Sequence, residues 1–142
     1  MKEIEVWKFI DQSLENKEPV GLMLVTESAG SSPGRQGFKM AINLKGEMQG
    51  SIGGGIMEHK LVEMMKSNLA GTKASSKLKK QVHRKDESLN QSGMICSGEQ
   101  TVLLLPVSLK DHDCIKEIIH YLVNKEKASL TIDPQGLSVK PN

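Results

Sequence analysis

Near the N-terminus, apolar residues recur at spacings of three and four positions, with charged residues between them: Ile4, Trp7, Ile10 and Leu14. This period predicts an amphipathic helix over residues 4–14. A continuous apolar run, VGLMLVT, follows at 20–26 and is bounded by Pro19 and a Ser/Gly/Pro-rich stretch. Such a run is typical of a strand buried on both faces, so we expect a central strand here.

The next part of the chain predicts a loop, a hairpin and a helix. The loop is SAGSSPGRQG at 28–37, which holds three glycines, three serines and one proline. Strict alternation of apolar residues over 38–44 and again over 48–52, with the turn sequence KGE between them, predicts a β-hairpin. Three glycines follow directly, and apolar positions from Ile56 to Leu69 then mark one face of a helix that ends at Gly71.

The second half continues this alternation of helices and strands. We expect a short strand over KLKKQVH, a buried strand at 99–107, a helix whose apolar face runs from Ile115 to Val123, and a final hairpin over 128–140. This order predicts an α/β fold, with residues 1–142 forming a single layered domain in which helices flank a mixed β-sheet. The dinucleotide fingerprint GxGxxG does not occur, so no Rossmann domain is expected.

Composition and charge exclude several classes of protein. The 142 residues carry 19 basic and 17 acidic side chains, a net charge of +2, which gives no general affinity for nucleic acid or for acidic membranes. The sequence has no apolar run long enough to span a bilayer and no secretion signal, so we expect a cytoplasmic protein. Cys96 and Cys114 form no CxxC motif and are expected to remain thiols in such a reducing compartment.

The sequence GSIGGG, at 50–55, is an unusual way to enter a helix, because glycine disfavours helices. A glycine-rich turn at a helix N-terminus exposes backbone N–H groups without obstructing β-carbons, which suits an anion such as phosphate. It is no dinucleotide fingerprint, because Ile52 occupies the second glycine position, and no P-loop, because GK[ST] is missing. The alternative is that Gly53, Gly54 and Gly55 only permit a tight turn and close packing of helix on sheet.

The other candidate residues also have simple structural readings. Arg35 in the first loop could be a solvated charge, Cys96 a small buried hydrophobe, and Glu58 a carboxylate favoured by the helix dipole. The histidines show no metal-ligand spacing, and DHDC at 111–114 reads as a helix N-cap, so neither a metal site nor a catalytic residue is predicted. The basic run at 77–85 is interpreted as a solvated face or a partner contact.

Three segments, taken in order, resemble the XdhC/CoxI family of accessory proteins for the molybdenum enzymes xanthine dehydrogenase and carbon monoxide dehydrogenase. They are GSSPGRQGFKMAI, GEMQGSIGGGIMEHKL and GMICSGEQTVLLLPV. The resemblance covers roughly residues 5–140 and corresponds to the N-terminal domain of larger members. One departure is Ser97, where the family pattern resembles Cys-Gly-Gly.

The resemblance implies a chaperone-like protein that is not catalytic. It would bind the molybdenum cofactor (molybdopterin) transiently, help to mature it, and insert it into a xanthine dehydrogenase-type molybdenum hydroxylase. The expected partners are that apo-enzyme, a cysteine desulfurase and a second copy of the chain, and no NAD is expected. The expected cofactor-binding residues are Gly30, Ser31, Ser32, Arg35, Gly53, Gly54, Gly55, Glu58 and Cys96.

Two other functions stay open at this point. The chain could be a sulfur carrier, in which Cys96 takes a persulfide and passes it to the cofactor. It could also be a regulatory interaction domain that has kept the fold without binding the cofactor.

Overall fold

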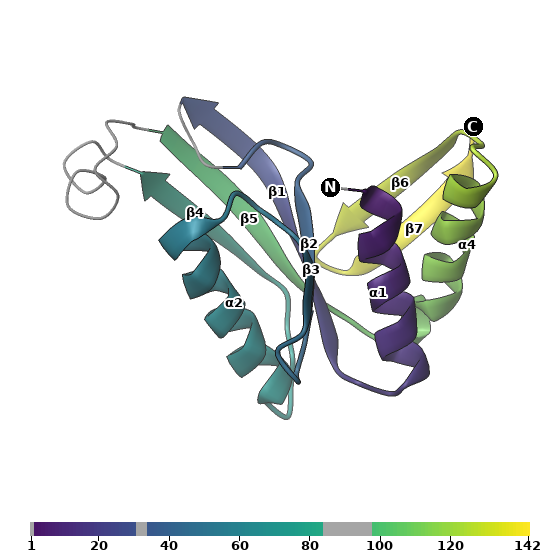
Figure 1. Ribbon diagram of the computed structural model, residues 1–142, viewed down its shortest axis with the longest axis horizontal. Coiled ribbons are helices and arrows are strands. Elements are labelled where there is room, and N and C mark those ends of the chain that lie inside the picture. Colours follow the sequence, from purple (N-terminus) through teal and green to yellow (C-terminus); the bar gives the residue numbers. More distant parts are fainter. Residues whose placement is uncertain (1, 31–33, 84–97) are drawn as a thin grey trace.

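The computed structural model describes residues 2–30, 34–83 and 98–142, which fold into layers on both sides of a five-stranded sheet (Figure 1). The helices are α1 (Glu3–Glu15), α2 (Gly55–Ala70) and α4 (His112–Val123), with a short 3-10 turn, η1, at Leu109–Asp111. The strands are β1 (Val20–Gly30), β2 (Lys39–Asn43), β3 (Met48–Gly50), β4 (Lys77–His83), β5 (Gly98–Val107), β6 (Ala128–Asp133) and β7 (Gly136–Pro141). The helices and strands expected from the sequence are therefore confirmed, and so is the layered α/β class.

The strand directions differ from the prediction of a mixed sheet. The order is β3-β2-β1-β5-β4, and each of these neighbouring pairs is antiparallel. The alternation of strands and helices suggested parallel neighbours joined by a crossover. Here β3 and β4 do run in the same direction and are joined by α2, but they form the two opposite edges of the sheet.

The central position predicted for the first strand is confirmed, but β1 is longer than expected. It extends to Gly30, so residues 28–30 of the predicted loop belong to the strand and pair with residues 98–100 of β5. The register shifts between Val25 and Glu27, and the Thr26 hydroxyl there donates a hydrogen bond to the Thr101 carbonyl at 3.2 Å. Pairing along β5 thus overrides the local preference of serine and glycine for loops.

Two apolar cores lie on opposite faces of the sheet. The core under α2 contains Met23, Val25, Met40, Ile42, Ile52, Leu61, Val62, Met65, Leu69, Val102 and Leu104. The other core lies under α1 and α4 and is joined by partly buried side chains of the β6–β7 hairpin; its buried members are Val6, Trp7, Ile10, Leu14, Val20, Leu22, Ala41, Val107, Ile115 and Ile118. The β6–β7 hairpin forms a separate two-stranded sheet.

Helix α2 packs very closely on β1. A β-carbon added to Gly21 would lie 2.4 Å from the Met65 Sδ, so the methionine occupies the space that a side chain would need. The predicted apolar face of α2 is partly wrong, because Ile56 and Met64 are 46% and 36% exposed. Within the part of the chain that the structure describes, no helix is both long and apolar enough to cross a bilayer.

Candidate functional site

The first loop, the start of β5 and the glycine turn meet at one end of the five-stranded sheet. Gly30, at the end of β1, pairs with Gly98, the first residue of β5, and Gly98 also pairs with His83 at the end of β4. The first loop therefore leaves the sheet beside Gly98, where β5 begins. The N-terminus of α2 lies at the same end, because the Gln81 Nε2 donates a hydrogen bond to the Met57 carbonyl at 3.0 Å.

Gln100 connects these segments from inside the protein. Its side chain is 2% exposed, and its Oε1 accepts a hydrogen bond from the Gly34 N–H at 2.8 Å. Its Nε2 donates to the Ile52 carbonyl at 3.3 Å and to the Gln81 Oε1 at 3.1 Å. A buried amide that satisfies both its donor and its acceptor sides fixes its neighbours in position. Gln100 thus ties the first loop, the glycine turn and β4 together.

Gly34 is a glycine for steric reasons. A β-carbon at this position would lie 2.3 Å from the Ile52 carbonyl oxygen and 3.0 Å from the Gln100 Oε1. Neither Gly34 nor Gln100 was among the site residues expected from the sequence. The available signal was a polar amide directly before a run of apolar strand residues, a position where burial forces the side chain to find partners.

The glycine turn adopts backbone angles that only glycine takes easily. Gly53, Gly54 and Gly55 have φ values of 126°, 74° and 74°, which confirms that these residues serve a backbone geometry. A β-carbon on Gly54 or Gly55 would meet no atom within 4 Å. Close packing of helix on sheet therefore does not explain these two glycines, and open space lies beside their backbone.

Glu58 braces this turn from within. Its Oε1 accepts hydrogen bonds from the Ser51 hydroxyl at 2.6 Å, the Ile52 N–H at 2.9 Å and the Gly54 N–H at 3.0 Å. The Gly53 N–H donates in turn to the Ser51 Oγ at 3.1 Å. The carboxylate thus takes the place that an anion would have at these N–H groups.

The first turn of α2 keeps donors of its own. Helix α2 begins at Gly55, and Gly54 gives it no side-chain cap. The first N–H groups of a helix have no partner within the helix. An external anion would therefore be held by the N–H groups of Gly55 and Ile56, beside the open space at the glycines.

Comparison with known proteins gives the family of this segment. Residues 13–79 match the model of the XdhC and CoxI family. This part of the chain, a little under half of it, is similar to the XdhC and CoxI family. The resemblance found in the sequence is thereby confirmed, and the matched range contains the first loop and the glycine turn.

Solved structures support the same fold. Three chains match, and one is a crystal structure described as a xanthine dehydrogenase from Bacillus halodurans. It is 21% identical with a TM-score of 0.70, and the match covers 96% of this chain and 40% of that one. At this identity the likeness shows the fold alone, and this chain spans well under half of the length of the other. A search of curated proteins finds no match.

The residues predicted to bind the cofactor divide into two sets. Gly30, the three turn glycines, Arg35 and Glu58 lie in the described part of the chain, whereas Ser31, Ser32 and Cys96 lie outside it. Arg35 is exposed and directly follows Gly34, which Gln100 holds against the glycine turn. Glu58 has an internal role in the turn, and ligand binding by it stays a prediction.

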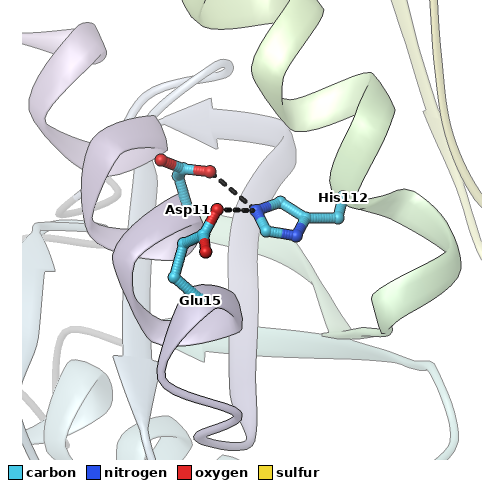
Figure 2. A group of neighbouring side chains, drawn as sticks. All are labelled: Asp11, Glu15 and His112. Carbon is cyan, nitrogen blue, oxygen red and sulfur yellow. Dashed lines mark hydrogen bonds and ion pairs between the residues drawn. The ribbon is translucent and has the colours of Figure 1, made fainter.

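A second polar group lies away from this end of the sheet, between α1 and α4 (Figure 2). The His112 Nε2 contacts the Asp11 Oδ1 at 2.7 Å and the Glu15 Oε1 at 3.6 Å. The Lys116 ammonium contacts the same two carboxylates at 3.3 and 2.9 Å. Because a cation of the chain already neutralises both carboxylates, we interpret the group as an interhelical ion-pair network. Asp111 accepts hydrogen bonds from the Ser108 N–H and hydroxyl at 3.2 and 3.3 Å, so its side chain caps η1. Asp111 also occupies the N-cap position of α4, as expected for this segment, but its side chain makes no cap hydrogen bond to that helix.

Proposed function

We propose that this protein is an accessory chaperone that binds the molybdenum cofactor transiently and delivers it to a xanthine dehydrogenase-type molybdenum hydroxylase. The observation that carries the proposal is the junction at Gln100, where the first loop and the glycine turn meet beside the start of β5. The match of residues 13–79 to the XdhC and CoxI family supports a role in the maturation of such enzymes.

The chemistry of this end of the sheet fits such a cofactor. Molybdopterin carries a phosphate, a polar pterin and a dithiolene that ligates molybdenum. The N–H groups of Gly55 and Ile56 suit the phosphate, because they lie at the positive end of the α2 dipole beside backbone that no β-carbon obstructs. Arg35 would add a cation. In our proposal the bracing by Glu58 keeps the turn in this geometry before the ligand arrives.

The proposed partner is the apo-form of a molybdenum hydroxylase. The solved structure from Bacillus halodurans with the same fold is itself described as a xanthine dehydrogenase, which supports this class of partner. We further propose that the chain acts in the cytoplasm and uses no NAD. A cysteine desulfurase remains a proposed second partner. Cys96 remains the proposed contact to the cofactor at its sulfur-coordinated molybdenum.

The proposal is tested by purifying the protein from a host that makes the molybdenum cofactor and assaying it for molybdenum and for the fluorescent oxidised pterin. Near-stoichiometric pterin is expected in the parent protein. Gly54→Ala should lose it, because the new methyl group projects into the open space, and because φ 74° with ψ −174° is backbone that only glycine takes easily, with a strain of about 1–3 kcal/mol.

Gly46→Ala is the matched control. Gly46 has a φ of 89° and lies in the β2–β3 turn, where the β-hairpin reverses at the other end of the sheet. Alanine is also strained at this positive φ, but the variant should still retain the cofactor. Equal loss of pterin in both variants would show that stability, and not the site, controls retention. Absence of pterin from the parent protein, even after incubation with free cofactor, would overturn the proposal in favour of an interaction domain.

A further inference from the structure

Strand β4 forms an edge of the five-stranded sheet. It pairs with β5 along Lys77–His83, and within the described residues no strand lies on its other side. Every second backbone N–H and C=O of this strand therefore faces outward. Such an edge can accept one more strand from another chain, with main-chain hydrogen bonds along its length.

The side chains of β4 are unusual for an edge that only has to remain soluble. Leu78 and Val82 are 58% and 41% exposed and share one face of the strand with Lys80. Their strand neighbours Lys77, Lys79 and Gln81 point to the opposite face, toward α2, which Gln81 reaches through its hydrogen bond to the Met57 carbonyl. Both apolar side chains thus lie open on the face away from α2.

A hollow lies on the α2 side of the same edge. It has a volume of about 390 Å³ and is lined by Glu63, Met64, Ser67 and Asn68 of α2 and by Lys77 of β4. Met64, in its wall, is one of the exposed apolar residues of α2. The α2 side of the edge is thus mostly polar, whereas the opposite face offers the apolar side chains of Leu78 and Val82.

The positive charge of β4 determines which kind of strand can pair with its outer edge. Its seven residues include Lys77, Lys79 and Lys80 and no acidic residue. The Glu99 carboxylate lies 3.4 Å from the Lys80 ammonium and compensates part of this charge. A second copy pairing antiparallel about the middle of β4 would set Lys80 against the same lysine, and like charges directly opposite are unfavourable. The lysines disfavour self-pairing and favour an acidic strand.

We propose that the outer edge of β4 docks an extended segment of a partner protein in which acidic side chains alternate with apolar ones. On the α2 side the acidic side chains pair with Lys77 and Lys79, and on the opposite face the apolar ones cover Leu78 and Val82. The edge lies next to the candidate site, since Gln81 joins β4 to the first turn of α2. The proposal does not depend on cofactor binding, so either can fail without the other.

The test uses the full chain and a short fluorescein-labelled peptide in which glutamate and valine alternate. Fluorescence anisotropy should give saturable binding, and hydrogen exchange should show new protection of backbone amides within residues 77–83. Leu78→Thr with Val82→Thr, and separately the triple change of Lys77, Lys79 and Lys80 to Glu, should each weaken binding by about tenfold or more. All five side chains lie on the edge strand outside the buried core, so the variants should remain folded.

The control triple variant changes Lys8, Lys45 and Lys110 to Glu, which alters the net charge equally at exposed sites away from β4. It should bind as the parent does. Equal weakening by both triple variants, or equal affinity for a peptide with its glutamates and valines in separate blocks, would reduce the effect to non-specific charge attraction and overturn the proposal. So would tight competition by a single-stranded oligonucleotide, or a dimer in solution whose formation protects the same amides.

Discussion

The backbone N–H of Gly34 and the side-chain Oε1 of Gln100 are joined by a hydrogen bond of 2.8 Å, although 66 positions separate them in the sequence. The bond fixes the first loop, at Gly34, to β5, a strand from the other half of the chain. Through its Nε2, the same amide also holds the Ile52 carbonyl of the glycine turn. The geometry of the candidate site therefore depends on one buried glutamine.

Gln100→Leu should destabilise the fold and release the first loop. The leucine fills the space but leaves the Gly34 N–H and the Ile52 carbonyl without their partner, at about 1–3 kcal/mol for each group. Urea denaturation should show this loss, and pterin retention should fall. The same substitution at Gln49, on edge strand β3, should change the free energy of unfolding by less than about 0.5 kcal/mol. An unaltered unfolding midpoint for Gln100→Leu would contradict the role given to Gln100.

Glu58 should contribute to stability through the turn that it braces. Glu58→Gln keeps an acceptor oxygen but removes the charge that strengthens three hydrogen bonds, so we expect a loss of about 1 kcal/mol. Glu58→Ala removes the acceptor altogether and should cost about 1–3 kcal/mol. The comparison is Glu63→Gln on the same helix, whose side chain is 54% exposed. Equal effects of the changes at Glu58 and Glu63, measured by urea denaturation, would argue against the bracing role.

Gly21 and Met65 should be energetically coupled. Gly21→Ala forces the Met65 side chain to move and should cost about 1–3 kcal/mol. Met65→Ala alone should cost about 2–5 kcal/mol through the cavity that it leaves. In the double variant the new methyl group occupies part of that cavity, so the combined loss should be smaller than the sum. A double-mutant cycle measures this coupling, and simple additivity would show that the two residues do not compete for space.

The ion-pair network between α1 and α4 should give a pH dependence in the alkaline range. Hydrogen bonding to Glu15, and then to Asp11, raises the pKa of Lys116 above its ordinary value of 10.5. The folded state thus holds this proton more tightly than the unfolded state does. Its stabilisation is present in full below 10.5 and is lost as the pH rises through the pKa of the folded chain.

Lys116→Met keeps the apolar stem and removes the charge. The difference in melting temperature between the parent protein and this variant should stay constant from neutral pH to about pH 9 and shrink above pH 10.5. A difference that does not change across the alkaline range would mean that the ammonium group contributes nothing to stability.

Much of this fold follows from local patterns in the sequence. The spacing of Trp7 and Ile10 gives α1, and the run beginning at Val20 gives a central strand whose side chains enter both cores. Local patterns do not contain the direction of neighbouring strands, because α2 could have led to an adjacent parallel strand instead of the opposite edge. They also do not reveal that Ser28 continues β1, since its partner in the ladder lies on β5.

The glycines of the candidate site could be predicted from the sequence, but the hydrogen bonds by which Glu58 and Gln100 support them could not. Three successive glycines before a helix indicate unusual backbone angles wherever they occur. That the Glu58 carboxylate turns back into the turn, and that Gln100 reaches the Ile52 carbonyl, depends on distances that exist only after the sheet has formed. Contacts between residues far apart in the chain leave no periodic trace in the sequence.

The place of β5 in the middle of the sheet has a consequence for the order of events on the ribosome. Residues 13–79 include β1, β2, β3 and α2, but the strand that separates β1 from β4 is synthesised only at residues 98–107. Until then β1 lacks one of its two neighbours, and Gly34 and Ile52 lack the amide that joins them. The site is therefore completed late in translation, and a nascent chain that stops before β5 exposes an unpaired apolar strand that needs protection against aggregation.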